Sequence, residues 1–521
     1  MPSRHSHAPG IRFTDLPNEI LHQICVSVPE EVDVTSCMSS MHSLRQAYLK
    51  SLVPVTMTSR RLLGITMPLF YRMICIDDCE QQERLLRTMI SNPGLRSCVT
   101  TVVVTEYVSP PDARQQRRVQ PLYIQRGTAI QTHTGAHPLF RAPHGQVQRR
   151  GSPANQLWAA ANRSDPTIDN PYVDNLWACS TRDAVIELFN LFSLLPELSR
   201  LVYISRRNTT FQHTFDTLVK AIISNAAPEV SGRFFHNLQR ITIAPLDLFD
   251  NLDLLDSLTT LPRVSSLTSI FTPDGFGIFH SPVAWSIPRI RDLRVFVPTE
   301  AMDHLSQVLG SIDELEMLDL QLCTSPWLQP FRGPNKALFR AMKAHCKTLR
   351  QLSLSIHIPP AVSKYKIPRE PILYPRDWSS FGELRSLSLL DADLYTKGTD
   401  INEVLSHLPP QLQTLTITAW YHKEDGMRLL RELVVQVSIT ARLNLACLRS
   451  VVVSEQMIGS GSTIRYDVAA LVPRFKRERI KLGYRQVIAY GTHCGCISKK
   501  QRGYSEAESD WLRTGRPPSL W

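Results

Sequence analysis

The sequence contains no run of about 18 apolar residues, which is the shortest length that suits a bilayer-spanning helix. Residues 1–7 show no apolar stretch like that of a signal peptide. The eleven cysteines are scattered and odd in number, so they lack the spacing of a disulfide framework. We therefore expect no membrane contact and a reducing compartment, either the cytoplasm or the nucleus.

The sequence also lacks the short motifs of common enzymes. It has no Gly-rich loop ending in Gly-Lys-Ser/Thr, no His-Glu-x-x-His and no Gly-x-Ser-x-Gly. His493, Cys494 and Cys496 would supply at most three metal ligands, and no second Cys/His pair lies near them in sequence. We expect a non-catalytic protein with no cofactor and no metal site.

Acidic residues are scarce in two segments of a chain whose formal net charge is +11. Residues 474–502 contain nine Lys or Arg and one acid, Glu478, and residues 113–150 contain seven Arg and no acid. The cluster at 474–485 fits nucleic-acid phosphates, a nuclear-import signal or a solvated end of the domain. The residues leave these three interpretations open, with nucleic acid the least favoured.

A short amphipathic helix is predicted near the N-terminus. Thr14 or Asp15 can cap it, and Pro17 suits its first turn. One apolar stripe follows at i, i+4, i+5 and i+8, formed by Leu16, Ile20, Leu21 and Ile24. A second helix is predicted within 59–72, where apolar residues recur.

These two stretches resemble the F-box in its common fungal form. The resemblance is carried by Leu16-Pro17-x-Glu19-Ile20-Leu21-x-x-Ile24, and by Ser59-Arg60-Arg61-Leu62 with Pro68-Leu69-Phe70-Tyr71-Arg72. It covers residues 12–76. It implies contact with the Skp-type adaptor of an SCF-type cullin–RING ubiquitin ligase, with catalysis on a partner. The implied adaptor-binding residues are Leu16, Pro17, Ile20, Leu21, Ile24, Leu62 and Leu63.

A repeat of the form apolar-x-x-apolar-x-apolar follows. Its copies begin at Leu198, Leu238, Val264, Ile290, Leu315, Leu349, Leu384, Leu412 and Leu448. Helices are predicted between copies or beside them, at 183–195, 211–225, 301–312, 335–346, 401–408 and 426–441. Each unit has one apolar face that it cannot bury alone, so we expect a curved solenoid with strands on the concave side. The units resemble the divergent leucine-rich repeats that follow F-boxes in many fungal proteins.

The expected fold class is α/β, with a small N-terminal helical F-box module followed by an irregular leucine-rich-repeat solenoid. Polar residues between the apolar strand positions point away from the core and are candidates for substrate binding. Together with two aromatic residues that follow one strand, they are Arg350, Gln351, Ser353, Arg385, Ser386, Ser388, Gln413, Thr414, Thr416, Trp420 and Tyr421.

The predicted organisation has six parts. Residues 1–11 form a disordered N-terminus, 12–76 the F-box-like module, and 77–108 a helix and first strand, at 81–91 and 95–104. Residues 109–175 form a disordered basic insertion in which 157–161 can be a short helix or a docking peptide. The repeat domain covers 176–490, including a last strand at 486–490, and 491–521 is an extended basic tail.

Three functional hypotheses follow. The first is the substrate-recognition subunit of a ubiquitin ligase, in which the F-box binds the adaptor and the repeats bind an unidentified protein substrate. The second is an interaction scaffold that serves no ligase. The third, less favoured, is a nucleic-acid-associated protein that uses the basic C-terminal segment.

Overall fold

The computed structural model describes about half of the chain. The described residues are 17–21, 53, 57, 59–106, 152–164, 176–204, 209–246, 252–271, 287–298, 302–323, 335–357, 378–390, 406–419, 445–457, 471–473, 475–476 and 479–488. The chain divides into two compact units, and the boundary falls within a strand, β3 (Arg200–Ile204), and again within a helix, α8 (Thr209–Ile223). Each unit is described by itself.

The first unit begins with helices and a short parallel strand pair. It contains α3 (Arg60–Arg72), β1 (Met73–Ile76), α4 (Cys79–Ser91), the 3-10 helix η2 (Pro93–Cys98), β2 (Thr101–Thr105), α6 (Pro153–Ser164), α7 (Leu176–Phe192) and α9 (Pro228–Ser231). β1 pairs with β2 in parallel, from Met73 opposite Thr101 to Ile76 opposite Val104. The predicted helical module 12–76 therefore ends in a strand, and the predicted strand 95–104 begins only after η2.

Five phenylalanines form the core of the first unit. They are Phe189 and Phe192 of α7, Phe215 of α8, and Phe234 and Phe235. Phe189 contacts Phe215 edge to face, with ring centroids 4.9 Å apart, and Phe192 lies 5.2 Å from Phe235. Phe235 has a φ of 53°, a region that side chains with a Cβ rarely adopt. Burial of its ring in this cluster offsets that cost.

Helix α6 lies inside the predicted disordered insertion, which the structure thereby corrects over 153–164. Ala154, Leu157 and Ala160 are buried on one side of α6, and the backbone N–H of Ala154 donates to Asn190 Oδ1 of α7 at 3.1 Å. The spacing of these three residues matches one helical face. The short helix expected at 157–161 is confirmed and extended at both ends, whereas 109–151 and 165–175 lie outside the described residues.

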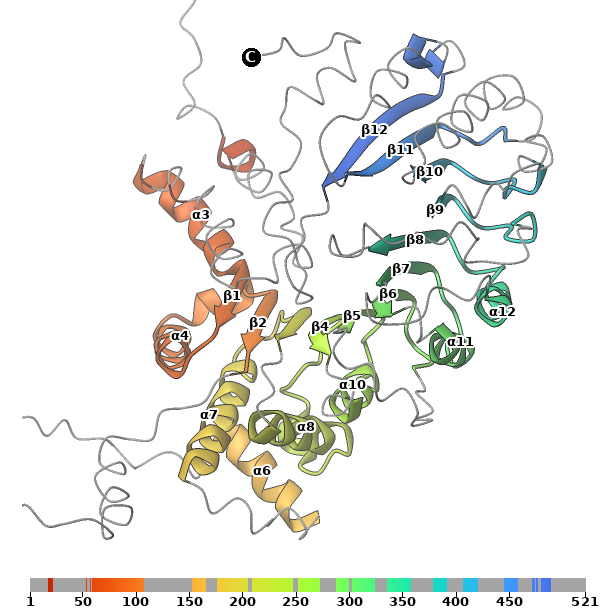
Figure 1. Ribbon diagram of the computed structural model, residues 1–521. Helices are drawn as coiled ribbons and strands as arrows, with labels where there is room; N and C mark the ends of the chain where they lie inside the picture. The colour runs from red at the N-terminus through yellow and green to blue at the C-terminus, as the bar shows by residue number, and fades with distance from the viewer. Residues whose placement is uncertain are drawn as a thin grey trace, which may run out of the picture. The chain divides into compact units, whose positions relative to one another are not determined.

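The second unit is a run of parallel strands. They are β4 (Arg240–Leu246), β5 (Ser266–Phe271), β6 (Asp292–Pro298), β7 (Met317–Cys323), β8 (Gln351–His357), β9 (Ser386–Leu390), β10 (Thr414–Ala419), β11 (Ser450–Met457) and β12 (Lys481–Ile488). Sheet neighbours in this unit are always consecutive in the chain, and every pair is parallel. Figure 1 shows α10 (Leu252–Thr259), α11 (Met302–Gly310) and α12 (Lys336–Ala344) on one side of these strands.

All nine sequence copies form strands, which confirms the repeat. The second apolar position of each copy is buried, and from β4 onward it stands in register with that of the next, in the row Ile241, Leu267, Leu293, Leu318, Leu352, Leu387, Leu415 and Val451. Burying such a row removes one large apolar side chain per strand from water, which contributes about 1.5–3 kcal/mol each. The fold class is therefore α/β with an open parallel sheet.

The residue just before a strand helps to fix the register in which the following strand of the sheet pairs with it. Its backbone carbonyl accepts two N–H groups from the following copy: Arg350 O accepts from Arg385 N at 2.8 Å and from Ser386 N at 3.1 Å. Glu316 O, Arg385 O and Gln413 O do the same. In the first unit, Thr100 O accepts from Ser199 N and Arg200 N, both at 3.0 Å. These bonds satisfy carbonyl groups that would otherwise lie unpaired at the strand entry.

Helices α11 and α12 are joined at both ends. Asn335 caps α12 through a bond from Leu338 N at 2.7 Å, and its Nδ2 donates to Asp303 Oδ1 of α11 at 3.2 Å. At the other end, buried His345 Nε2 lies 2.9 Å from Leu309 O. Because a carbonyl oxygen only accepts, the proton of His345 lies on Nε2.

Several boundaries differ from prediction. The helices expected at 183–195, 211–225, 301–312 and 335–346 are present as α7, α8, α11 and α12, with shifted ends. Helix α10 was not predicted. The last strand begins at Lys481 rather than at 486, because it pairs with β11 along its whole length. The predicted helix 426–441 and most of 401–408 lie outside the described residues, as do 1–11 and 491–521.

We predict that Leu352→Ala lowers the free energy of unfolding by about 2–5 kcal/mol, because it removes a buried side chain from the middle of the leucine row. Chemical denaturation of the full chain measures this change. Ser353→Ala, on the next residue of β8 and facing the other way, serves as the control and should shift it by less than about 1 kcal/mol. If both variants lowered the free energy of unfolding equally, the assigned alternation of buried and solvent-facing residues along β8 would be wrong.

Candidate functional site

The two halves of the N-terminal motif both form helical turns in the first unit. Leu21 N donates to Pro17 O at 3.0 Å, which closes the turn that Pro17 begins. Ser59 caps α3, since its Oγ accepts from Leu62 N at 3.1 Å. Ser59 is thus the N-cap that lets the second predicted helix start at Arg60.

A hydrogen bond joins the two halves in space. Arg61 Nε of α3 donates to Asn18 Oδ1 at 2.7 Å, across 43 residues of sequence. This contact sets the two short helical segments side by side although each alone is too short to be stable in water. The structure thus brings Asn18 and Arg61, one from each stretch, into direct contact.

The predicted adaptor-binding residues divide into two groups. Leu21 and Leu62 are 0% and 3% exposed and belong to the core, whereas Ile20 and Leu63 are 41% and 43% exposed. Pro17 is also exposed. Adjacent residues on a helix point about 100° apart, so one of each pair faces inward and the other outward. Leu16 and Ile24 lie outside the described residues.

Most of the exposed large apolar side chains in the described part of the chain fall in this stretch of the sequence. Of the six in the described part of the chain, Ile20, Val53, Met57 and Leu63 all lie between residues 17 and 63. The other two are Ile90 and Ile223. Exposed apolar side chains are candidates for protein contact, and Ile20 and Leu63 each lie two residues from the Asn18–Arg61 bond that joins the two segments.

The second candidate site is the solvent-facing side of the strands in the second unit. Gln351, Ser386 and Thr414 stand in one register row, and Ser353, Ser388 and Thr416 in another. All six are at least partly exposed and alternate with buried residues, as the sequence predicted. Trp420 and Tyr421 lie outside the described residues.

Arg350, Arg385 and Gln413 form a separate row just before the strands. Each is the residue whose carbonyl accepts two bonds from the next copy, so the three are held next to one another by backbone contacts. Arg291 and Glu316 precede them in the same row, and Arg449 follows. We call these six residues the entry row.

Sequence reasoning missed half of the entry row. Arg291, Glu316 and Arg449 each stand directly after the first apolar residue of a copy, which is the signal that could have identified them.

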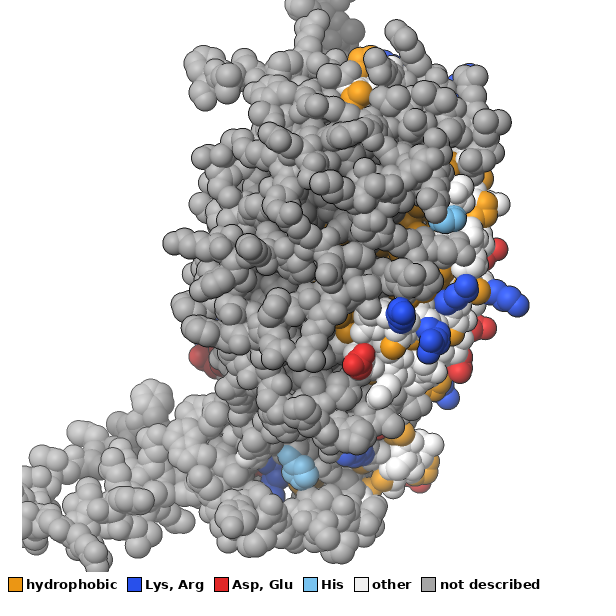
Figure 2. Space-filling model, turned by 45° about the vertical axis from the view of Figure 1, so that its right-hand side comes forward, with side chains coloured by type: hydrophobic (Ala, Val, Ile, Leu, Met, Phe, Trp, Pro, Cys, Tyr) orange, Lys and Arg blue, Asp and Glu red, His pale blue; other side chains and the backbone are white. Residues whose placement is uncertain are grey.

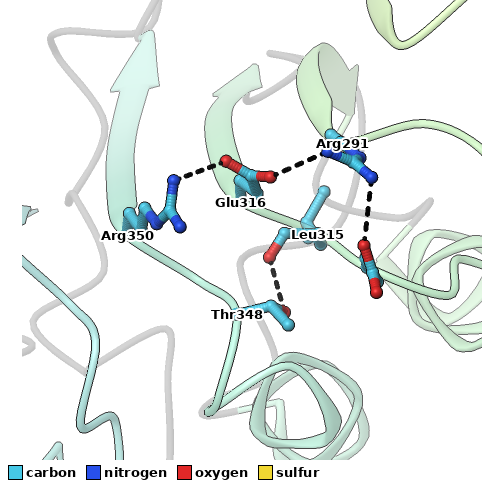
Figure 3. A network of polar contacts seen from close by, with 6 residues as sticks. Arg291, Leu315, Glu316, Thr348 and Arg350 are labelled. Carbon is cyan, nitrogen blue, oxygen red and sulfur yellow. Dashed lines mark hydrogen bonds and ion pairs between the residues drawn. The ribbon is translucent and has the colours of Figure 1, made fainter.

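Ion pairs occupy one end of the entry row. Glu316 lies between Arg291 and Arg350, with Oε1 3.4 Å from Arg291 Nη1 and Oε2 3.0 Å from Arg350 Nη1 (Figure 3). Arg291 Nη2 also lies 3.2 Å from Glu314 Oε2. The pairs are solvent-exposed, so each contributes at most about 1 kcal/mol. Their main effect is to neutralise the basic side chains at this end.

One carboxyl group next to this network has a shifted pKa. Desolvation by burial raises the pKa of Asp292, and the nearby charge of Glu316 raises it further. Arg240, Arg294 and Arg291 act in the opposite direction and only partly compensate. The shift of Asp292 therefore comes mainly from its burial, with Glu316 as the one carboxylate that adds to it.

The remaining sequence signals add no site. Among the residues that the structure describes, no group of three His, Cys, Asp or Glu side chains could hold a metal ion. His493, Cys494 and Cys496 are outside that set. Lys476, Arg479 and Lys481 of the basic cluster are described and exposed. No described helix is long and apolar enough to cross a membrane.

Comparison of the chain with protein-family models and with curated proteins gives no match.

We predict that Leu62→Ala lowers the free energy of unfolding by about 2–5 kcal/mol, because it leaves a cavity under α3. Leu63→Ala makes the same change one residue further along the helix and should cost less than about 1 kcal/mol. Both variants replace Leu by Ala in the same helix, so the change in helix propensity is the same in each. The difference between their free energies of unfolding therefore measures the effect of burial. A larger loss in Leu63→Ala would contradict the orientation of α3.

We predict that Asp292→Asn stabilises the protein at pH 7 by up to about 1 kcal/mol. A raised pKa in the folded state means that stability falls as pH rises above the ordinary value of 3.8, since the unfolded chain releases the proton more readily. The gain should disappear below that pH, where both states are protonated. Denaturation across pH measures it, with Asp313→Asn, an exposed aspartate, as control. A destabilised Asn variant at pH 7 would contradict the prediction.

Proposed function

We propose that the chain is the substrate-recognition subunit of an SCF-type cullin–RING ubiquitin ligase. In this proposal the N-terminal module is an F-box that binds a Skp-type adaptor, and the strands of the second unit belong to a leucine-rich-repeat solenoid that binds a protein substrate. The chain itself is non-catalytic. It raises the effective concentration of substrate near the ubiquitin-conjugating partner, in the cytoplasm or the nucleus.

One observation carries the proposal. The Arg61–Asn18 bond holds together the two halves of the F-box-like motif, and the exposed Ile20 and Leu63 lie one on each half. An adaptor helix that covered both side chains would remove their remaining exposed area from water, which contributes roughly 0.5–1.5 kcal/mol for each because they are less than half exposed. This is how an apolar helical surface binds a partner helix.

The buried and exposed residues have distinct parts in this proposal. Leu21 and Leu62 hold the module together from inside, whereas Pro17, Ile20 and Leu63 are the described residues that can contact the adaptor. The strand faces of the second unit supply the substrate surface, because polar residues recur there in register over β8 to β10.

We predict that the double variant Ile20→Asp/Leu63→Asp loses binding to a Skp-type adaptor by at least about tenfold, because two carboxylates would be buried in an apolar interface. Co-purification of the full chain with the adaptor, followed by calorimetric titration, measures the loss. Both positions are solvent-exposed, so the variant should keep its circular dichroism spectrum and denaturation midpoint.

Ile90→Asp is the matched control. Ile90 is 57% exposed on α4 of the same unit but lies outside the motif, so its variant should bind the adaptor like the wild type. Equal loss in Ile90→Asp, or no adaptor binding by the folded wild-type chain, would overturn the proposal. The second result would leave the interaction scaffold that serves no ligase.

A further inference from the structure

The charged residues of the second unit are distributed unevenly along the sheet. Between Leu238 and Leu322, the described side chains include five Arg and seven acids. Between Asn335 and Tyr484 they include ten Lys or Arg, all exposed, and a single acid, Glu383. In Figure 2 several Lys and Arg side chains lie close together on one face, with a few Asp and Glu beside them. Among the described residues, the acids therefore cluster around β7, at Asp313, Glu314, Glu316 and Asp319, whereas Lys and Arg predominate from α12 and β8 onward.

The entry row carries this basic charge to one edge of the strand face. Arg350, Arg385 and Arg449 are exposed, and Lys481 follows at the start of β12. Arg350 is partly neutralised by Glu316, whereas no ion pair among the described residues involves Arg385 or Arg449. Two guanidinium groups are therefore available for an outside anion.

The face next to these arginines is small and polar. Ser353, Ser388 and Thr416 lie in register there, and hydroxyl groups can donate or accept hydrogen bonds. Because these side chains are small, the backbone of an extended chain can approach the strands closely. Because these three residues are uncharged, they do not repel an acidic chain.

We propose that this edge binds an acidic, extended polypeptide segment through its carboxylates. The inference rests on the proposed function in one respect: if the chain is the substrate-recognition subunit of a ligase, the acidic segment belongs to the substrate. Arginine pairs with carboxylates in a bidentate geometry, and such charge-assisted bonds are stronger than neutral ones. The acidic side chains on and just before β7, above all Glu316, repel the same segment and confine it to β8–β11.

The register sets the spacing that the segment needs. Neighbouring strands lie about 4.8 Å apart, so Arg350, Arg385 and Arg449 span roughly 14 Å at their backbones. An extended chain rises about 3.3 Å per residue, so a run of about five residues covers that distance. A segment with acids throughout such a run can reach all three arginines, whereas an isolated acid reaches one.

The test titrates the full chain, without adaptor, with a fluorescent peptide containing six consecutive glutamates, at about 0.15 M salt. Arg385→Glu/Arg449→Glu should weaken binding by about tenfold or more, since two charge-assisted contacts become repulsive. Arg340→Glu/Lys343→Glu changes the net charge equally but on exposed positions of α12, and it should bind like the wild type. Glu316→Gln should strengthen binding severalfold, because it releases Arg350 and removes a repulsive carboxylate.

Three results would overturn the inference. The first is no binding of the glutamate peptide by the folded wild-type chain, including the case in which only a phosphorylated peptide binds. The second is equal weakening in the α12 variant, which would show charge attraction without a site. The third is tighter binding of a single-stranded oligonucleotide that Arg385→Glu/Arg449→Glu also abolishes. Since the adaptor is absent and Ile20 and Leu63 are unchanged, none of these results bears on the adaptor contact.

Discussion

The second unit depends on one constraint: each copy of the repeat has apolar side chains that it cannot bury without the copies on either side of it. Leu318, Leu352 and Leu387 are in register on β7, β8 and β9, so every strand completes the core of the strand before it. The paired bonds to Glu316 O and Arg350 O prevent slippage by one residue, which would turn every leucine outward. Stability in such an arrangement is a sum of contacts between neighbours.

That constraint also determines what the surface can do. Because the core rows are fixed, the residues between them form rows of their own, and a side chain repeated at one position of each copy becomes a continuous strip. The entry row arises in this way from residues separated by tens of positions in sequence. At one end of the row Glu316 pairs with Arg291 and Arg350, whereas Arg385 and Arg449 further along face solvent. A linear charge pattern thus becomes a polarised edge suited to an elongated partner.

The first unit has a different organisation. Its aromatic cluster around Phe189 is a conventional core, and the N-terminal module contributes a surface rather than a chemical centre. The Arg61–Asn18 bond matters because it joins two short segments that have little stability alone. The exposed Ile20 and Leu63 leave apolar area uncovered, which in the proposed function is the area that the adaptor covers.

The sequence alone determined the repeat, all nine of its strands, and the side to which their leucines point. This succeeded because period-two burial and β-branched or leucine-rich runs are local properties. It also determined a helix within 59–72 from its recurring apolar residues, and the structure shows that Ser59 caps this helix. Helix α10 and the true start of β12 were missed, because short segments take their structure from neighbours such as β11.

Only the tertiary structure decided which residues of each apolar pair are core. Ile20 and Leu21, or Leu62 and Leu63, are indistinguishable by composition and differ only in what packs against them. The entry row was likewise invisible as a unit, because Arg291, Glu316 and Arg350 come together through strand pairing across intervening helices and loops. Local sequence specifies the strand, whereas burial and adjacency follow from the contacts that the whole fold makes.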